Sequence, residues 1–183
     1  FDLAKESSTI FDIGANIGWY SLNFDKLDNV QEVYSFEPIP RTFNYLSQHV
    51  SINQCSKINL NNFALSNRNG KTEFFCNIKE TGSSSMKNIQ DRPDSIKVTC
   101  QLRTMDDFTQ SNKLGVDMIK CDVEGSELMV FQGGIETLKH NKPYIFTEML
   151  RKWSAKFDYH PNDIITLLRN LGYMCCAYEQ NKL

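Results

Sequence analysis

The sequence predicts an α/β fold with a mostly parallel sheet and helices on its faces. Two patterns support this prediction. Short apolar segments of strand-like composition alternate along the chain with segments whose apolar residues recur at helical spacing. The first strand-like segment also runs through a glycine-rich turn, residues 11–18 (FDIGANIG), directly into a helical pattern. Since 183 residues with 40% hydrophobic content allow one sizeable core, we expect a single domain over residues 1–183.

The first part of the chain supplies three predicted strands and two helices. The strands are residues 9–13 (TIFDI), 33–37 (VYSFE) and 58–65 (INLNNFAL). Pro38 and Pro40 end the second strand, because a proline disfavours continued pairing and biases the residue before it. The apolar faces of the two helices comprise Ile17, Tyr20, Phe24 and Leu27 in the first, and Phe43, Leu46 and Val50 in the second.

The middle of the chain has a different pattern, in which two strand-like segments follow one another without a helical segment between them. Residues 71–78 (KTEFFCNI) and 96–102 (IKVTCQL) read as two antiparallel strands, and a polar loop containing TGSSSMKN, residues 81–88, lies between them. We therefore expect a β-hairpin inserted into the parallel fold.

The core pattern then resumes to the end of the chain. Residues 116–122 (VDMIKCD) and 143–148 (PYIFTE) are core strands, separated by a helix that runs through Leu138. Pro161 opens a further helix, and residues 173–178 (YMCCAY) form a last predicted strand. The apolar face of this last helix comprises Ile164, Leu167, Leu168 and Leu171, and Gly172 stops it.

Charge and hydropathy argue against two classes of partner. The formal net charge is −2 and no lysine- or arginine-rich block is present, so a nucleic-acid partner is disfavoured. No apolar run approaches the roughly 20 residues of a membrane span, which predicts a protein without a membrane partner. The six cysteines form no C-x-x-C pair and no zinc-like spacing with histidine, so we expect free thiols and a cytoplasmic location. The sequence does not indicate an oligomeric state.

The glycine-rich turn and the end of the second strand predict a ligand site. Gly14 and Gly18 permit close approach of a ligand to the carboxyl edge of the sheet, where folds of this class bind nucleotide-like molecules. Glu37 ends the neighbouring strand, and its carboxylate can accept two hydrogen bonds from a ribose diol. Tight packing of strand against helix is the alternative explanation for the glycines.

Six segments resemble one family in order and spacing: FDIGANIGWYSL, YSFEPIPRTFNYL, ALSNRNGKTEFF, TMDDF, DMIKCDVEGSELMVFQGG and PYIFTEM. They are similar to the FkbM-type S-adenosylmethionine-dependent methyltransferases over roughly residues 9–150. The resemblance implies the Rossmann-like, doubly wound sheet of class I methyltransferases, mostly parallel, with the β-hairpin inserted. It also implies transfer of a methyl group to a hydroxyl oxygen of a sugar or natural product, and hence a small-molecule or glycan acceptor. Class I methyltransferases usually end with a further strand hairpin, so we expect a domain truncated at one or both ends.

The residues of the turn suit S-adenosylmethionine as cofactor. The motif is D-x-G-x-N-x-G, so Asn16 replaces the glycine that a dinucleotide's pyrophosphate requires. Asp12, Asn16 and the turn's backbone can meet the amino and carboxylate groups of the cofactor's methionine part, and Glu37 its ribose. By analogy with the family, Asn62 and Phe63 lie near the adenine, although a core position explains Phe63 equally well. The predicted cofactor-binding set comprises Asp12, Gly14, Asn16, Gly18, Glu37, Asn62, Phe63 and Asp122.

Carboxylates at two strand ends are the candidates for catalysis. Methyl transfer requires an aligned oxygen nucleophile and a group that accepts its proton, and Asp122, Glu124 and Glu148 can act as bases or orienting groups. The same three side chains could bind magnesium or calcium, or could offset the positive charge of the sulfonium, so a divalent metal stays open. His160 is a further catalytic candidate on the side where the active-site loops gather. A helix-capping role before Pro161 is its alternative.

Two other functional classes remain. A nicotinamide-dependent oxidoreductase would use a similar β-α-β start, but it would require the G-x-G-x-x-G motif that this chain lacks. A non-catalytic binding domain with the same fold would keep the glycine turn and could lose the carboxylates. Retention of Asp122, Glu124 and Glu148 argues for the enzyme.

Overall fold

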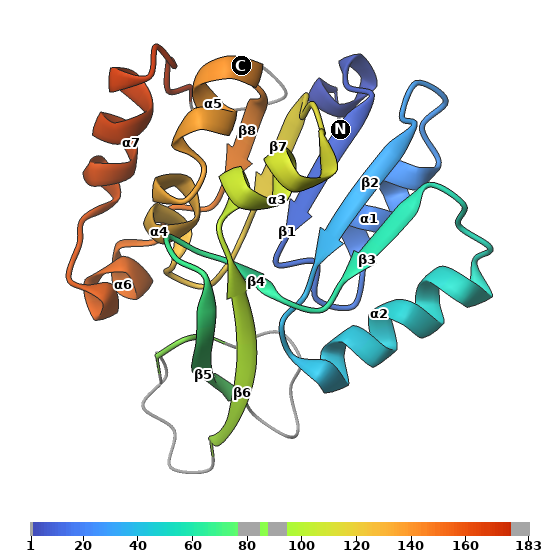
Figure 1. Ribbon diagram of the computed structural model, residues 1–183, viewed down its shortest axis with the longest axis horizontal. Coiled ribbons are helices and arrows are strands. Elements are labelled where there is room, and N and C mark those ends of the chain that lie inside the picture. The colour runs from blue at the N-terminus through green and yellow to red at the C-terminus, as the bar shows by residue number, and fades with distance from the viewer. Residues whose placement is uncertain (1, 77–84, 88–94, 177–183) are drawn as a thin grey trace.

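A computed structural model of the protein describes residues 2–76, 85–87 and 95–176. Five parallel strands form the central sheet, in the order β3-β2-β1-β7-β8 (Figure 1). The strands are β1 (Thr9–Ile13), β2 (Glu32–Phe36), β3 (Ile58–Asn61), β7 (Met118–Cys121) and β8 (Tyr144–Thr147). The strand order reverses between β1 and β7, which is the arrangement that creates a ligand crevice at the carboxyl edge of a doubly wound sheet.

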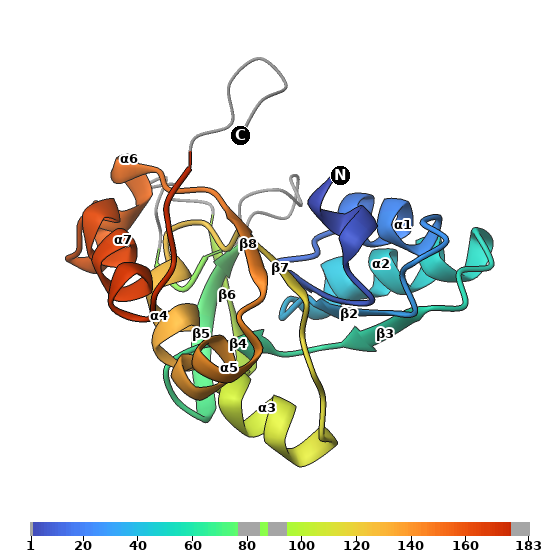
Figure 2. The same cartoon turned by 90° about the horizontal axis from the view of Figure 1, so that it is seen from above.

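Helices cover both faces of this sheet, as the view from above shows (Figure 2). One face carries α1 (Trp19–Asp25) and α2 (Pro40–Ile52); the other carries α3 (Met105–Asn112), α4 (Glu127–Gln132), α5 (Ile135–Asn141) and α7 (Pro161–Asn170). Short helical turns occur at η1 (Leu3–Glu6), α6 (Arg151–Ser154) and η2 (Ala155–Phe157). The predicted Rossmann-like, doubly wound fold is therefore confirmed.

The alternation of side chains along the strands divides the hydrophobic core between the two faces. Phe11 and Ile13 of β1 pack into the larger cluster, with residues of α3, α4, α5 and α7. Ile10 packs into the smaller cluster on the opposite face, with Phe24 of α1. Asp12 lies on the α1 face like Ile10, so a carboxylate is carried into the interior next to an apolar layer.

One helix of the structure was not predicted, and one predicted helix is divided in two. The chain forms α3, which no apolar periodicity indicated; its first turn is capped by Thr104, whose side chain accepts a hydrogen bond from the Asp107 N–H. The single helix predicted through Leu138 is in fact two helices, α4 and α5, separated at Gly133 and Gly134. A Cβ at Gly133 would lie 2.0 Å from the Ser66 carbonyl oxygen, so the break lets the backbone pack tightly against the segment after β4.

The strand predicted at residues 58–65 is also divided. β3 ends at Asn61, and Ala64–Leu65 form a separate strand, β4, in a second sheet. The Asn62 side chain donates to the carbonyl oxygens of Glu37 and Pro38, at 2.8 and 3.2 Å, where the chain changes sheets. These hydrogen bonds explain why the pairing with β2 stops there.

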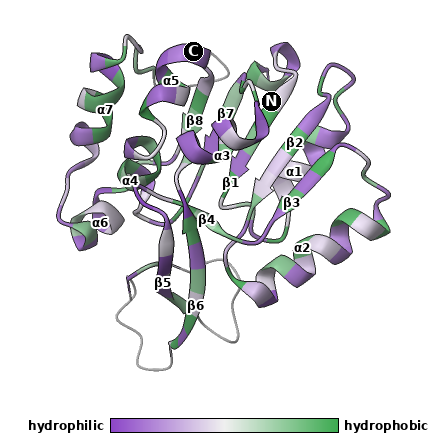
Figure 3. Cartoon of the chain, viewed as in Figure 1, coloured by the Kyte–Doolittle hydropathy of each residue, from purple (hydrophilic) through white to green (hydrophobic). Residues whose placement is uncertain are grey.

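The second sheet contains β4, β6 (Ile96–Arg103) and β5 (Gly70–Cys76), in that order. β5 and β6 pair antiparallel, which confirms the inserted β-hairpin; residues 77–78 of its first predicted strand and most of the loop at 81–88 lie outside the described residues. Apolar and polar residues alternate along β6 (Figure 3), and the buried face packs into a third cluster with Ile39.

The predicted last strand, residues 173–178, is wrong for residues 173–176, which have no strand structure; residues 177–178 lie outside the described part of the chain. The Tyr173 hydroxyl instead donates to the Leu138 carbonyl oxygen at 3.0 Å, and Met174 is 85% exposed. Tyr173 therefore contacts α5, and residues 174–176 are exposed and pair with no edge strand. All six cysteines are free thiols, as predicted. None of the helices described is long and apolar enough to cross a membrane.

Candidate cofactor and active site

A cavity of about 290 Å³ lies at the carboxyl ends of β1, β2 and β7, where the strand order predicts a ligand crevice. Its walls include the turn after β1, the start of the segment after β2, and the loop after β7. Strand β4 and two residues of the insertion, Phe74 and Met86, also line it. Five predicted site residues line it: Gly14, Asn16, Glu37, Asp122 and Glu124. Six others do not: Asp12, Gly18, Asn62, Phe63, Glu148 and His160.

The turn after β1 adopts a backbone that few residue types tolerate. Gly14, Asn16 and Gly18 all have positive φ, at 76°, 50° and 96°. A Cβ at Gly14 would lie 2.0 Å from the Asp122 carbonyl oxygen, so this position needs glycine for both its conformation and its contact with the end of β7. The turn and the acidic strand end thus form one wall of the cavity.

The first three N–H groups of the turn, those of Gly14, Ala15 and Asn16, are already occupied by protein acceptors. Those of Gly14 and Ala15 donate to the Phe36 carbonyl oxygen, both at 3.0 Å, and that of Asn16 donates to Glu37 Oε2 at 3.1 Å. They are not free to serve as the backbone donors expected from the sequence. Asn16 Oδ1, by contrast, is buried and has no hydrogen-bond partner among the described residues. A buried acceptor without a donor is costly, so the cavity is suited to a ligand with a positively charged or N–H donor group at this point.

Glu37 closes the other side of the turn. Its carboxylate is buried, and Oε1 accepts a hydrogen bond from the Ile39 N–H at 2.9 Å while Oε2 accepts from Asn16. Burial raises the pKa of Glu37 to about 7, against the opposing effect of these backbone hydrogen bonds. The two N–H groups fix the orientation of a carboxylate that still has lone pairs for ligand hydroxyls.

Asp12 lies behind the turn rather than on the cavity wall. Its carboxylate has no exposed surface; Oδ2 accepts a hydrogen bond from the Ser21 hydroxyl at 2.6 Å, and Oδ1 lies 3.2 Å from Lys120 Nζ. Lys120 does line the cavity, and sequence reasoning missed it. The available signal was a lysine in the middle of an apolar strand, MIKC, where burial requires a partner.

Neither of the two residues predicted near the adenine lines the cavity. The Asn62 amide is engaged with the backbone after β2, and the Phe63 ring packs against Phe36 and Phe108, with centroids 5.5 and 5.7 Å apart. The cavity is lined instead by Ala64 and Leu65 of β4. The alternative placement of Phe63 against the core thus describes its position, and a contact of Asn62 with adenine stays a prediction.

The loop after β7 presents the acidic end of the cavity. Asp122 is partly exposed, and Glu124 has a positive φ of 52°, a conformation that non-glycine residues adopt mainly where the surroundings impose it. The Ser85 hydroxyl donates to the Glu124 carbonyl oxygen at 2.9 Å. Burial, then the nearby carboxylates of Asp122 and Glu148, raise the pKa of Glu124 to about 7. A carboxyl group with that pKa is suited to accept or release a proton near neutral pH.

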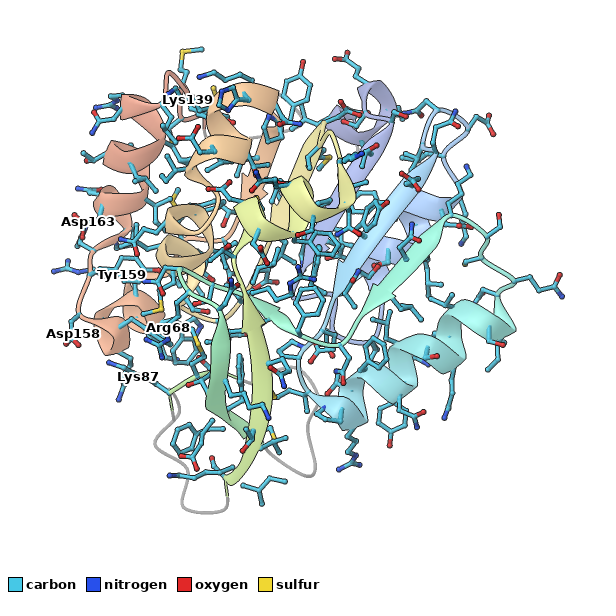
Figure 4. All side chains as sticks on the ribbon, viewed as in Figure 1. Arg68, Lys87, Lys139, Asp158, Tyr159 and Asp163 are labelled. Atoms are coloured by element: carbon cyan, nitrogen blue, oxygen red, sulfur yellow. The ribbon has the colours of Figure 1, made fainter. Side chains whose placement is uncertain are left out.

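Glu127 holds this loop in place rather than facing a ligand. Its Oε1 accepts hydrogen bonds from the N–H groups of Val123 and Gly125, both at 3.1 Å, and its Oε2 accepts from the Tyr159 hydroxyl at 3.1 Å. Tyr159 comes from the segment between α6 and α7 (Figure 4). A structural explanation for Glu127 is therefore sufficient, and it anchors the loop that carries Glu124.

The remaining two catalytic candidates lie off the cavity. Glu148 is exposed immediately after β8; burial, Asp122 and Glu127 raise its pKa. His160 is the N-cap of α7: its Nδ1 accepts a hydrogen bond from the Asn162 N–H at 3.1 Å, and Asp163 completes the capping box. The capping alternative thus accounts for the position of His160, and its catalytic role stays a prediction. Among the described residues, no group of three or more His, Cys, Asp or Glu side chains is arranged to hold a metal ion.

Comparisons with known proteins agree with this geometry. The family model of the methyltransferase FkbM domain matches residues 12–175. The chain is 28% identical over 160 residues to the 2-O-methyltransferase NoeI of Sinorhizobium fredii (strain NBRC 101917 / NGR234), which covers 80% of this chain and 65% of NoeI. The chain thus spans about two thirds of the length of that curated relative.

Two solved structures have the same fold. One is methyltransferase FkbM from Methylobacillus flagellatus KT, with a TM-score of 0.60 and 17% identity, covering 91% of this chain and 37% of that chain. The other is a Streptococcus mutans protein in complex with SAH, with a TM-score of 0.52 and 7% identity, covering 93% of this chain and 78% of that chain. At these identities the likeness shows the fold alone.

Proposed function

Because the chain belongs to the FkbM family of methyltransferases, we propose that it transfers a methyl group from S-adenosylmethionine to a hydroxyl oxygen of a sugar or natural product. The observation that carries this proposal is the cavity formed by the turn after β1 and Glu37, in which a buried Asn16 oxygen still needs a donor. The solved structure that contains SAH on the same fold supports the choice of cofactor.

The charges of the cavity favour a sulfonium cofactor over a dinucleotide. Its described lining carries three carboxyl side chains, Glu37, Asp122 and Glu124, and one amine, Lys120, which is already paired with Asp12. A pyrophosphate would need free N–H donors and a positive environment, whereas the first N–H groups of this turn are occupied. A nicotinamide-dependent oxidoreductase is therefore the weaker candidate.

The residues present fit the parts of S-adenosylmethionine. Glu37 would accept hydrogen bonds from the ribose hydroxyls, Asn16 Oδ1 would accept one from the α-amino group, and Ala64 and Leu65 would give the adenine an apolar wall. When bound, this cofactor supplies an electrophilic methyl group whose C–S bond breaks as the new C–O bond forms.

The acidic end of the cavity supplies the remaining requirement, which is removal of the proton from the acceptor hydroxyl. Glu124 is the first candidate base because it lines the cavity and its pKa is raised to about 7. Asp122 is placed to orient the hydroxyl, while its charge and that of Lys120, 4.0 Å away, offset one another in part. The proton would pass from the acceptor oxygen to the Glu124 carboxylate and then to solvent.

Calorimetric titration tests the cofactor directly. We expect the protein to bind SAH and S-adenosylmethionine and not NAD. Glu37→Ala should weaken SAH binding by about 1.5–3 kcal/mol for each hydrogen bond lost to the carboxylate. Glu32→Ala is the matched control, because Glu32 begins the strand that Glu37 directly follows and does not line the cavity.

Two outcomes would contradict the proposal. The cofactor assignment fails if NAD binds and SAH does not, and the role of Glu37 fails if the Glu37→Ala and Glu32→Ala proteins bind SAH equally. For the acceptor, SAH release is measured with a panel of hexopyranosides and phenols in the presence of S-adenosylmethionine. A non-catalytic binding domain would bind SAH and release none with any member of a broad panel.

A further inference from the structure

One buried ammonium group links the cofactor turn to the acidic end of the cavity. Lys120, in strand β7 between β1 and β8, is 3% exposed. Its Nζ donates to the Gly14 carbonyl oxygen at 2.9 Å, lies 3.2 Å from Asp12 Oδ1 and lies 4.0 Å from Asp122 Oδ2. A single side chain thus contacts β1, the turn that follows it and the end of β7.

Packing of the sheet does not by itself explain a lysine at this position. Met118, two residues earlier on the same face of β7, packs into the apolar cluster beneath α1. Burial acts to lower the pKa of Lys120, and the carboxylates of Asp12 and Asp122 more than offset that effect, so that its pKa is raised. A buried ion pair is seldom more stabilising than well-packed apolar side chains, so its retention here calls for a reason other than stability.

We propose that Lys120 is a positioning residue for the amino-acid half of the cofactor site, an inference that rests on the function proposed above. Its hydrogen bond to the Gly14 carbonyl oxygen fixes the backbone that continues through Ala15 to Asn16. The buried Oδ1 of Asn16 has no hydrogen-bond donor among the described residues. The adenosine half is set by different contacts, those of Glu37 with the Asn16 and Ile39 N–H groups. Lys120 makes no hydrogen bond to Glu37.

Because the two halves of the site are held by different contacts, we expect loss of Lys120 to weaken binding of the amino-acid part of the ligand and not of its adenosine part. The probes are SAH and 5′-methylthioadenosine, which carries the same adenosine and lacks the amino acid. The charge of Lys120 lowers the pKa of Glu37, so its loss raises that pKa above the wild-type value of about 7; titrations near pH 8.5 limit this contribution. For Lys120→Met we expect the Kd of SAH to rise at least about tenfold, and that of 5′-methylthioadenosine to change less than about threefold.

Lys57→Met is the matched control, because Lys57 also ties down a backbone carbonyl, that of Leu27 at 2.7 Å, away from the cavity. It should leave both affinities unchanged. Thermal melting shows whether Lys120→Met is folded; if it is not, the pair Asp12→Asn with Lys120→Met removes both charges together, and the same selective loss of SAH affinity is expected.

The inference is overturned if the folded Lys120 variant binds both ligands as the wild type does, or weakens for both by the same factor. The first result would give Lys120 no role in binding, and the second would make it a general support of the fold. If the wild-type protein binds neither ligand, the proposed function itself fails, which is a separate outcome.

Discussion

Both ends of the cavity carry carboxylates, but the two ends differ in the hydrogen bonds that these carboxylates accept. At the cofactor end, Glu37 follows β2 beside the turn after β1; it is 6% exposed, and each of its carboxylate oxygens accepts a backbone N–H. At the loop after β7, no hydrogen bond between described residues reaches the carboxylates of Asp122 or Glu124, although the backbone around Glu124 is tightly held. One end thus holds its carboxylate in a fixed orientation, whereas the carboxylates of the other accept no hydrogen bond from the described residues, and Asp122 has only an ion pair with Lys120 at 4.0 Å.

This difference suggests a division of labour. A cofactor is the same in every turnover, so a site for it gains from groups fixed before binding. Carboxylates that must orient a hydroxyl and take its proton need free lone pairs and a pKa near the working pH. The rigid support of Glu124, by Ser85 at its carbonyl and by Glu127 at its neighbours, then positions the group without occupying its carboxylate.

The largest effect is expected from removing a charge at the free end. Glu124→Gln keeps the size of the side chain and loses its basicity, so kcat with an accepted alcohol should fall by about 10²–10⁴-fold. The Kd of SAH should change little, because the cofactor end is untouched.

Glu148→Gln is the matched variant, since Glu148 is also close to Asp122 but is exposed and does not line the cavity; a smaller loss of kcat is expected. An equal loss in the two variants, or a Glu124 variant with wild-type turnover, would reject Glu124 as the base. Turnover that a chelator abolishes and magnesium restores would assign proton removal to a metal-bound hydroxyl.

The next prediction tests the close contact between Gly14 and Asp122, which joins the two ends of the cavity. Gly14→Ala places a Cβ against the Asp122 carbonyl, 2.0 Å away, and also requires a positive φ, so the turn has to move away from the strand end. We expect the affinity for SAH to fall by about 100-fold or more, measured by calorimetry beside a melting curve.

Gly70→Ala is the control that distinguishes backbone strain from a steric contact at the cavity. Gly70 also has a positive φ, 136°, but a Cβ there would meet nothing within 4 Å, and the residue does not line the cavity. This variant should melt at a lower temperature, through backbone strain of about 1–3 kcal/mol, and bind SAH normally. Weakened binding in both variants would attribute the effect to stability alone.

The smallest expected effect is the pH dependence of SAH binding at the end of the cavity that contains Glu37. Glu37 must be ionised to accept both ribose hydroxyls, and burial raises its pKa to about 7. Affinity for SAH should therefore be full at pH 8 and fall as the pH drops through 7, by about tenfold at pH 6. Isothermal titrations across this range measure the profile. Glu37→Gln, which has no titrating group, should show a weak and flat profile, and a flat wild-type profile would mean that Glu37 does not titrate in this range.

The parts of the site that were predictable from sequence depend on short stretches. The turn, with Gly14 and Asn16, and the carboxylate of Glu37 follow from the order strand, turn, helix, strand, in which each residue's place is set by its neighbours. Strand ends at Asp122 and Glu124 follow in the same way. Because the carboxyl ends of parallel strands meet at one edge, local patterns were enough to bring these residues together.

What could not be predicted depends on contacts between distant segments. Lys120 and Gly14 are 106 residues apart, and only the pairing of β1 with β7 shows that the lysine reaches the turn. The change of sheets at Asn62, which puts Ala64 rather than Phe63 on the cavity wall, depends on hydrogen bonds to the segment after β2. The N-cap role of His160 was recognisable as an alternative, but a sequence motif alone does not decide between a cap and a base.

The pairing of β4 with β6 has a consequence for how this protein can diversify. Ala64 and Leu65 pair with Leu102 and Arg103, so the chain leaves the parallel domain and rejoins it at neighbouring points. The closure entropy of a segment held at both ends grows only with the logarithm of its length, at about 0.6 kcal/mol for each doubling. A change in the length of the insertion is therefore expected to cost the five-stranded sheet little. Since the insertion contributes Phe74 and Met86 to the cavity wall, substitutions there can change the shape of the cavity while the five-stranded sheet stays unchanged.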